Sequence, residues 1–276
     1  MGFKKIIKDA YFTLVKRKEI LPVYFPINDN NLLDGKVSLI IGGDGDIGIA
    51  ISKQLIKSGS KVIIAGSNKT NLDIAKKALG DVKTIILNLN DIQSFRNKIA
   101  EASGFYGGVD IFINAAGVHI NRKDLNLLNI SLDEWDKVMN INLKGTYFLA
   151  QEMAKYFIKR KLVGHILIIT SSLALEPGWS PYRISKSALE SMIKGLAQQL
   201  LPYGIVVNGI GPGPTATKLL NYKKGDSIST QETTNERYTL PEEIAAFAKL
   251  LVSDLGDSAV GQTIYLSGGR GIIDIR

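Results

Sequence analysis

Short apolar runs alternate with amphipathic helical patterns along most of this chain. Strand-like runs rich in β-branched residues are expected at 37–41, 62–65, 84–87, 109–113, 166–169, 205–208 and 263–266. Helical periodicity falls between them, at 47–58, 71–79, 92–102, 132–156, 182–201 and 241–252. Strands that are apolar on both faces and separated by helices are typical of a parallel sheet covered on both sides. The pattern therefore predicts a doubly wound α/β domain over residues 34–276.

Residues 1–33 form a separate predicted region, an amphipathic helix and a linker. Apolar side chains recur there at the spacing of one helix face, opposite a basic face, at Phe3, Ile6, Ile7, Ala10, Tyr11, Leu14 and Val15. Two interpretations stay open: a helix that lies on anionic lipid, and an appendage that packs on its own domain or on a neighbouring subunit. We favour packing, because most amphipathic helices in soluble chains are docked on protein.

Composition narrows the class of protein. An apolar content of 45% and a charged content of 22% are ordinary for a soluble globular chain, and no run of about 18 apolar residues predicts a membrane span. The absence of cysteine excludes disulfides, thiolate catalysis and cysteine metal sites. Residues 1–20 hold half of the formal net charge of +8, so nucleic acid is not an expected partner. The N-terminus does not read as a secretory signal, so we expect a cytoplasmic protein.

The segment 214–240 is long, polar and weakly periodic. A loop of this length inside a compact domain is usually functional or disordered. We interpret it as a mobile lid over a substrate.

A glycine-rich turn directly follows the first predicted strand. It consists of Gly42, Gly43, Asp44, Gly45, Asp46, Ile47 and Gly48. Glycines permit a tight turn and let backbone N–H groups at the start of the next helix approach a pyrophosphate, which predicts a nucleotide cofactor. Asp46 stands where a middle glycine is expected. Either Asp46 turns away from the ligand and caps backbone donors at the helix start, or the site is degraded.

The end of the second predicted strand bears on the choice between NAD and NADP. An acid at this point favours a free ribose 2′-hydroxyl, and a basic residue favours a 2′-phosphate. The chain has Ser67, Asn68 and Lys69 there and no acid, so NADP is favoured over NAD. Asp44 argues in the opposite direction, because it brings negative charge near the expected phosphates.

Tyr182 and Lys186 are candidate catalytic residues. Residues four apart share a face of a helix, and a cation beside a phenol favours the phenolate. The pair therefore predicts acid–base chemistry without histidine. The same spacing arises by chance in ordinary amphipathic helices, so the surrounding motifs decide between the two interpretations.

Together these motifs resemble the short-chain dehydrogenase/reductase family, in particular its 3-oxoacyl-(acyl-carrier-protein) reductase-like members. The likeness covers residues 33–269 and rests on the glycine turn, the stretch 114–117, Asn142, the serines at 171–172, Tyr182 with Lys186, Asn208 followed by 212–215, and 261–269. It implies a Rossmann-like sheet of about seven strands in the order 3-2-1-4-5-6-7. It also implies an oxidoreductase that assembles as a dimer or a tetramer.

The resemblance assigns catalytic roles to four residues. Tyr182 would exchange a proton with the substrate oxygen, and Lys186 would lower the pKa of the phenol and hold the cofactor ribose. Ser172 would donate a hydrogen bond to the reacting carbonyl, and Asn142 would help to order a water relay to Lys186. The interval from Ser172 to Tyr182 is shorter than in many relatives, so Ser171 is the alternative carbonyl partner.

The resemblance also implies cofactor contacts at several strand ends, besides the glycine turn, Tyr182 and Lys186. These contacts are Ser67, Asn68, Asn88, Leu89, Asn114, Ala115, Ala116, Gly117, Pro212, Gly213 and Thr215. The chain departs from the family pattern at Ile41, Asp46, Asn88 and Ser267. These departures bear on the choice of cofactor and leave the catalytic residues intact.

The expected function is the NAD(P)-dependent interconversion of a ketone and a secondary alcohol, with a small-molecule substrate. A non-catalytic dinucleotide sensor or scaffold is an alternative, which the irregular glycine turn favours. A nucleotide-sugar-modifying enzyme is another, although the chain lacks room for the usual substrate domain. His119 and His165 are the only histidines, and neither joins a metal-ligand pattern, so no catalytic metal is expected. Glu176 and Trp179 face either the substrate or solvent.

Overall fold

The computed structural model describes residues 31–223 and 225–271. Within these ranges seven strands form one sheet in the order β3-β2-β1-β4-β5-β6-β7, and all neighbouring strands are parallel. The strands are β1 (Val37–Ile41), β2 (Lys61–Gly66), β3 (Lys83–Ile86), β4 (Ile111–Asn114), β5 (Gly164–Ile169), β6 (Ile205–Pro212) and β7 (Thr263–Leu266). The predicted doubly wound parallel sheet and its strand order are confirmed.

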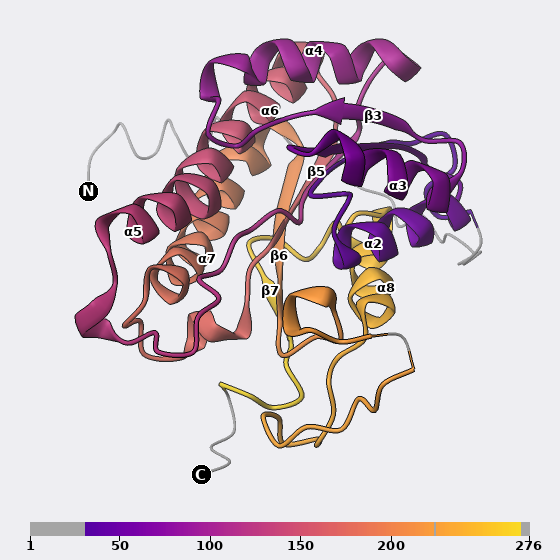
Figure 1. Cartoon of the computed structure of the whole chain (residues 1–276). Helices are drawn as coiled ribbons and strands as arrows, with labels where there is room; N and C mark the ends of the chain where they lie inside the picture. The colour runs from indigo at the N-terminus through magenta and orange to yellow at the C-terminus, as the bar shows by residue number, and fades with distance from the viewer. Residues whose placement is uncertain (1–30, 224, 272–276) are drawn as a thin grey trace, which may run out of the picture.

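Helices cover both faces of the sheet (Figure 1). One face carries α4 (Phe95–Tyr106), α6 (Thr146–Arg160) and α7 (Pro181–Leu200). The opposite face carries α2 (Asp46–Lys57), α3 (Lys69–Leu79) and α8 (Pro241–Leu251). This two-sided cover explains why the central strands β1, β4, β5 and β6 are buried at every position rather than at every second one.

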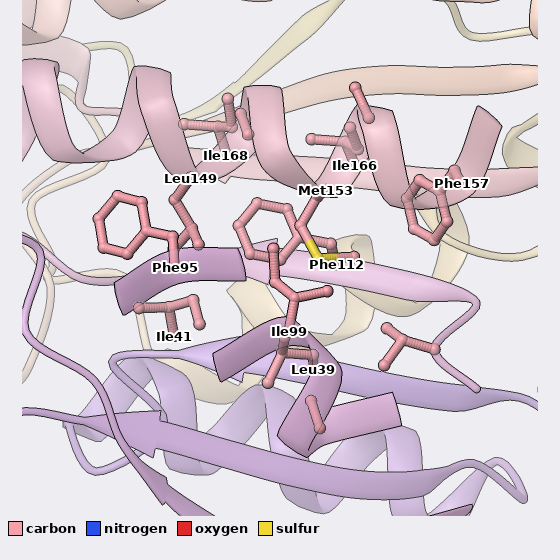
Figure 2. Close-up of a cluster of buried hydrophobic side chains, with 14 of the residues drawn as sticks. Leu39, Ile41, Phe95, Ile99, Phe112, Leu149, Met153, Phe157, Ile166 and Ile168 are labelled. Carbon is pink, nitrogen blue, oxygen red and sulfur yellow. The ribbon is translucent and has the colours of Figure 1, made fainter. Parts of the chain in front are cut away.

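Alternate residues of each strand enter different cores. Leu39 and Ile41 of β1 point to the α4 and α6 side, whereas Ile40 points to the α2 and α8 side. Figure 2 shows the first of these cores, in which Phe112 of β4 lies among side chains from α4 and α6. The aromatic residues Phe95, Phe112 and Phe157 are among its largest fully buried members.

The helix predicted over 132–156 is interrupted. It consists of α5 (Leu132–Val138), a π-helical stretch (Met139–Gly145) and α6. Gly145 ends the π-helical stretch where the chain passes so close to the backbone carbonyl of Leu89 that no side chain would fit. The interruption therefore coincides with a close approach of the helix to the loop after β3.

The start of α7 is fixed by two residues. The Ser180 hydroxyl accepts a hydrogen bond from the Arg183 amide at 3.4 Å, and Pro181 occupies the first helical position. Tyr182 and Lys186 consequently lie in the first two turns of α7.

The amphipathic helix predicted at 3–15 lies outside the described residues. Leu33 is fully buried, and its amide donates to the Ser58 carbonyl at 2.9 Å, so the main domain already includes Leu33. The boundary between residues 33 and 34 otherwise stays a prediction. Among the described residues, no helix combines the length and apolar character needed to cross a membrane.

The two ends of the 214–240 segment are paired. The Ala216 amide donates to the Thr239 carbonyl, and the Thr239 amide donates to the Pro214 carbonyl, both at 2.9 Å. Between these ends the backbone is mostly irregular, with one short 3₁₀ turn at Lys218–Leu220. The segment is thus a loop with closed ends, and its mobility stays a prediction.

We expect Phe112→Ala to lower the free energy of unfolding by about 3–5 kcal/mol, because it removes a fully buried aromatic ring from the core in Figure 2. Phe105→Ala is the matched control, since Phe105 is 38% exposed, and should cost less than about 1 kcal/mol. Urea denaturation measures both; equal costs would contradict the assignment of Phe112 to the core.

Candidate active site

Two adjoining cavities open at the edge of the sheet where the carboxyl ends of the strands meet. The Tyr182 cavity, of about 350 Å³, is lined by residues that follow β4, β5 and β6 and by the start of α7. The Asp44 cavity, of about 280 Å³, lies over the carboxyl ends of β1, β2 and β3. Residues 115–118 line both cavities. A ligand of two linked parts can therefore occupy both cavities along this shared wall.

The glycine turn packs backbone against backbone. Gly42 has φ 72°, and a Cβ built on it would lie 2.7 Å from the backbone nitrogen of Ala116. A side chain at Gly48 would collide with the Gly42 carbonyl. Gly45 is the N-cap of α2 and provides no side-chain cap, so the first N–H groups of α2 stay available to an anion. The turn fits the phosphates of a dinucleotide.

Asp46 is turned away from both cavities. Its Oδ2 accepts a hydrogen bond from the Lys218 amide at 2.7 Å. The expectation that Asp46 caps the start of its own helix is wrong: the donor belongs to the 214–240 segment, which passes alongside. Asp46 therefore ties the glycine turn to that segment.

Asp44 points toward the end of β2. A Cβ built on Gly66 would lie 2.5 Å from the Asp44 Oδ1, so only a glycine leaves room for this carboxylate. Asp44, Ser67, Asn88 and Leu89 all line the Asp44 cavity. Burial raises the pKa of Asp44, and a hydrogen bond from its own backbone lowers it. An acid from the glycine turn thus occupies the place where the end of β2 has none.

Asn68 does not line either cavity, contrary to expectation. Its side chain caps α3 instead, accepting a hydrogen bond from the Asn71 amide at 3.0 Å. Asn71, one turn later, lines the Asp44 cavity in its place.

Ser171 rather than Ser172 acts on Tyr182, because hydrogen bonding with Ser171 lowers the pKa of that phenol. Ser171 is the N-cap of the 3₁₀ turn after β5, and its hydroxyl also accepts from the Leu173 amide at 3.2 Å. Ser172 lines the same cavity but is the first residue inside that turn and is only 1% exposed. Spacing to Tyr182 alone did not show which serine precedes the turn, and the choice between Ser172 and Ser171 as the carbonyl partner stays a prediction.

Desolvation controls the ionisation of this pair. Burial raises the pKa of Tyr182, and the hydrogen bond with Ser171 lowers it. Burial lowers the pKa of Lys186 to about 8, and the Glu190 charge raises it. The Lys186 Nζ donates to the Ile169 carbonyl at 3.0 Å and lies 5.6 Å from the centre of the Tyr182 ring. Burial and Ser171 account for the shift in the pKa of Tyr182, so the expected lowering of that pKa by Lys186 stays a prediction.

Asn142 and Asn114 shape the shared wall from behind. The Asn142 side chain accepts from the Val118 amide at 2.8 Å and donates to the Val118 carbonyl at 2.9 Å. Asn114 accepts from the Ala116 amide at 3.1 Å and donates to the Thr146 hydroxyl at 2.8 Å. Neither residue lines a cavity, so the direct cofactor contact expected of Asn114 is not supported.

Most of the remaining expected contacts lie where the sequence places them. Ile47, Ala115, Ala116, Gly117, Pro212, Gly213 and Thr215 all line the Tyr182 cavity. The Thr215 hydroxyl donates to the Gly213 carbonyl at 2.9 Å, which fixes the bend after β6. The loops after β4 and β6 therefore face each other across this cavity.

The two histidines lie at opposite ends of the sheet. His119 lines the Tyr182 cavity, with its ring centre 4.6 Å from that of Tyr182. His165, at the start of β5, lies with Asp254 and Asp257 in a group that could hold a metal ion. The statement that neither histidine joins such a group is therefore wrong for His165, although this group lines neither cavity.

Comparison with known proteins identifies the family. A family model described as enoyl-(acyl carrier protein) reductase matches residues 43–270. A 3-oxoacyl-(acyl-carrier-protein) reductase of Rickettsia conorii is 37% identical over 243 residues, which cover 86% of this chain and 97% of the relative. The chain belongs to the short-chain dehydrogenase/reductase family.

Solved structures agree with this assignment. A Brucella melitensis 3-ketoacyl-(acyl-carrier-protein) reductase complexed with NADH has a TM-score of 0.79 at 25% identity, covering 87% of this chain and 100% of the other. A Serratia marcescens short-chain dehydrogenase/reductase has a TM-score of 0.77 at 28% identity, with the same coverage of 87% and 100%. This short-chain dehydrogenase/reductase is thus an oxidoreductase that acts on CH–OH groups with a nicotinamide dinucleotide.

The sequence did not predict the ion network at the rim of the Tyr182 cavity. Arg270 pairs with Glu176 at 2.8 Å and with Glu232 at 2.6 Å. Glu176 also pairs with Arg183 at 2.7 Å. Glu176 and Trp179 line neither cavity, whereas Arg270 and Glu232 line the Tyr182 cavity. In this family member the network joins the loop after β5, the 214–240 segment and the C-terminal segment.

We expect Arg270→Ala to speed amide hydrogen exchange about threefold to tenfold in residues 229–240, because it releases Glu232 from the network. Arg96→Ala removes a comparable surface pair, with Glu152 on α6, and serves as the control. Exchange measured by mass spectrometry should change in 229–240 only for Arg270→Ala. Unchanged exchange there would show that the network does not hold the segment.

Proposed function

We propose that this protein interconverts a ketone and a secondary alcohol, with Tyr182 as the general acid and base. The observation that carries the proposal is the contact between Tyr182 and Ser171 in a cavity that adjoins the Asp44 cavity along residues 115–118. A phenol and a hydroxyl side by side can both donate to one carbonyl oxygen.

Bound nicotinamide dinucleotide supplies or accepts the hydride. In the reducing direction the Tyr182 hydroxyl gives its proton to the substrate oxygen as the hydride reaches the carbonyl carbon. Ser171 donates a hydrogen bond to the same oxygen and stabilises the negative charge that develops there. Burial raises the pKa of Tyr182, which keeps the phenol protonated and ready to donate at neutral pH.

The dinucleotide would be held by three parts of the chain. We assign its phosphates to the backbone N–H groups of the glycine turn, and its nicotinamide end to residues 212–215 after β6. The Lys186 ammonium lies close to Gly117, since a Cβ built on Gly117 would lie 3.5 Å from the Lys186 Nζ. From this position the ammonium would hold the nicotinamide ribose. Asn142 would position this wall through Val118.

We propose a 3-oxoacyl thioester as the substrate class. The relatives from Rickettsia conorii and Thermotoga maritima are both 3-oxoacyl-(acyl-carrier-protein) reductases, the second at 31% identity. Apolar side chains of Leu173, Leu219 and Leu220 line the Tyr182 cavity beside the polar pair and suit an acyl chain. The segment 214–240 supplies two of these three leucines, which supports its proposed role as a lid.

Tyr182→Phe should lower turnover of a 3-oxoacyl thioester by about 10²–10⁴-fold, because it removes the transferable proton. Binding of the dinucleotide should change by less than about threefold, since the ring and the fold are kept. Turnover followed by NADH and NADPH absorbance, with binding followed by fluorescence, tests both statements.

Ser171→Ala and Ser172→Ala form a matched pair in the same assay. Ser171→Ala should lower turnover by about 10²–10³-fold and Ser172→Ala by less than about fivefold. If Tyr182→Phe is active, Tyr182 is not the general acid and base. If Ser172→Ala loses more turnover than Ser171→Ala, Ser172 is the carbonyl partner. Absence of turnover with every ketone tried would favour a sensor or scaffold.

For the cofactor we propose NAD(H) rather than NADP(H), against the expectation from the end of β2. The Asp44 carboxylate lies against Gly66, where the ribose of the adenosine half is expected. A carboxylate there accepts a hydrogen bond from a free 2′-hydroxyl and repels a 2′-phosphate. Lys69, which favoured NADP, lines neither cavity.

Asp44→Asn should tighten NADPH binding about tenfold, because it removes a charge that repels the 2′-phosphate. Asp136→Asn changes the net charge equally on exposed α5 and should leave both affinities unchanged. Fluorescence titrations of NADH and NADPH measure the two dissociation constants. Tighter binding of NADPH than of NADH by the unmodified protein would overturn the assignment.

A further inference from the structure

Helix α7 carries a third polar side chain in line with Tyr182 and Lys186. Glu190 follows Lys186 by four residues, as Lys186 follows Tyr182. Side chains at this spacing share one helix face, with Cβ atoms about 5–6 Å apart. Glu190 lines neither the Tyr182 cavity nor the Asp44 cavity, so it lies behind Lys186 as seen from the substrate.

Lys186 is in an environment that disfavours its charge. Its side chain is only 4% exposed, and its Nζ donates a hydrogen bond to an uncharged acceptor, the Ile169 carbonyl. A buried ammonium loses most of its hydration energy, and a single carbonyl replaces only part of it. A nearby carboxylate is the group that best compensates, because it interacts with the whole charge.

Glu190 is a half-buried residue whose carboxylate lies on the sheet side of α7. One of its oxygens, Oε1, is buried and has no hydrogen-bond partner among the described residues. The Tyr265 side chain of β7 is a neighbour of this carboxylate, since hydrogen bonding with Glu190 contributes to the raised pKa of Tyr265. The Tyr265 ring packs on Gly211 of β6, where a side chain would collide with it. Glu190 thus faces Tyr265 of β7 as well as Lys186 of its own helix.

The other titratable groups around the pair are few. Tyr182 lies beneath the Lys186 ammonium on α7 itself, and Tyr265 faces Glu190 from β7. Lys144 lies on the π-helical stretch that packs against α7, and the Glu190 charge raises the pKa of Lys186. Burial and the Glu190 charge both raise the pKa of Tyr265, so its hydroxyl stays a donor to this carboxylate.

We propose that Glu190 is a positioning residue that acts through Lys186: its partly buried carboxylate is the counter-charge that keeps the Lys186 ammonium charged while Tyr182 exchanges its proton. This role rests on the proposed function, since it serves a reaction in which Lys186 is needed as a cation. The coupling between Glu190 and Lys186 does not depend on which substrate is reduced.

Glu190→Gln tests the proposal, because it keeps the shape of the side chain and removes the charge. Titration of Lys186 by lysine side-chain NMR on the full, ligand-free chain should show its pKa lowered by at least about one unit. For ketone reduction, the alkaline limb of the kcat/KM profile should move to lower pH by a similar amount. The sign follows because an ammonium with a lower pKa loses its proton earlier as pH rises.

Two further variants separate charge from structure. Glu190→Asp retains the charge and should restore most of the alkaline limb. Tyr265→Phe removes the hydrogen bond to Glu190 but keeps the ring and the carboxylate, so the pKa of Lys186 should stay within about 0.3 units of the unmodified value.

Three results would overturn the proposal. They are an unchanged Lys186 titration in Glu190→Gln, an equal shift in Tyr265→Phe, and a fall in kcat that is uniform across pH. If Glu190→Gln fails to fold, Glu190→Asp decides. An unshifted Lys186 pKa in folded Glu190→Asp supports the proposal. A Lys186 pKa lowered by about one unit in that variant contradicts it, because the charge is retained. Failure of every substrate would refute the proposed function alone, because the NMR titration needs no turnover.

Discussion

The contact between the glycine turn and the loop after β4 organises the whole site. Gly42 meets the Ala116 backbone directly, with no side chain between them. Two asparagines fix the other side of that loop, Asn114 through Ala116 and Asn142 through Val118. The wall common to both cavities therefore consists of backbone held on two sides. A ligand that spans the cavities meets a rigid surface whose shape depends little on side-chain rotamers.

Burial and neighbouring charges together set the pKa values of Tyr182 and Lys186 on one face of α7. Tyr182 is made a weaker acid and Lys186 a weaker base than they would be in water, in both cases because desolvation disfavours the charged form. The raised pKa of Tyr182 suits the proposed acid catalysis of carbonyl reduction, since the phenol retains its proton. Parallel strands make this possible, because their carboxyl ends deliver the loops after β4, β5 and β6 to one helix start.

Sequence patterns predicted the elements that depend on local periodicity. The seven strands, their order and Tyr182 with Lys186 on one helix were all anticipated, since each follows from spacing or from a motif in its family context. Ser171, Asp44 and Arg270 were harder, because their roles depend on which distant backbone they meet. The role of Ser171 depends on where β5 ends, and the role of Asp44 depends on the glycine at the end of β2. Arg270 pairs with Glu176, which lies 94 residues away in the sequence.

The π-helical stretch determines how the residues of α6 are rotated about the helix axis relative to those of α5. A π-helical turn contains more residues than the 3.6 of a regular α-helical turn, so it rotates everything that follows about the helix axis. Asn142 lies inside the stretch and faces Val118, whereas Leu149, Met153 and Phe157 of α6 follow it and face the core. If residues 139–145 took regular α-helical geometry with no change in length, α6 would turn by on the order of 100° relative to α5. One helix could then no longer place Asn142 against Val118 and also bury Leu149, Met153 and Phe157 in the hydrophobic core.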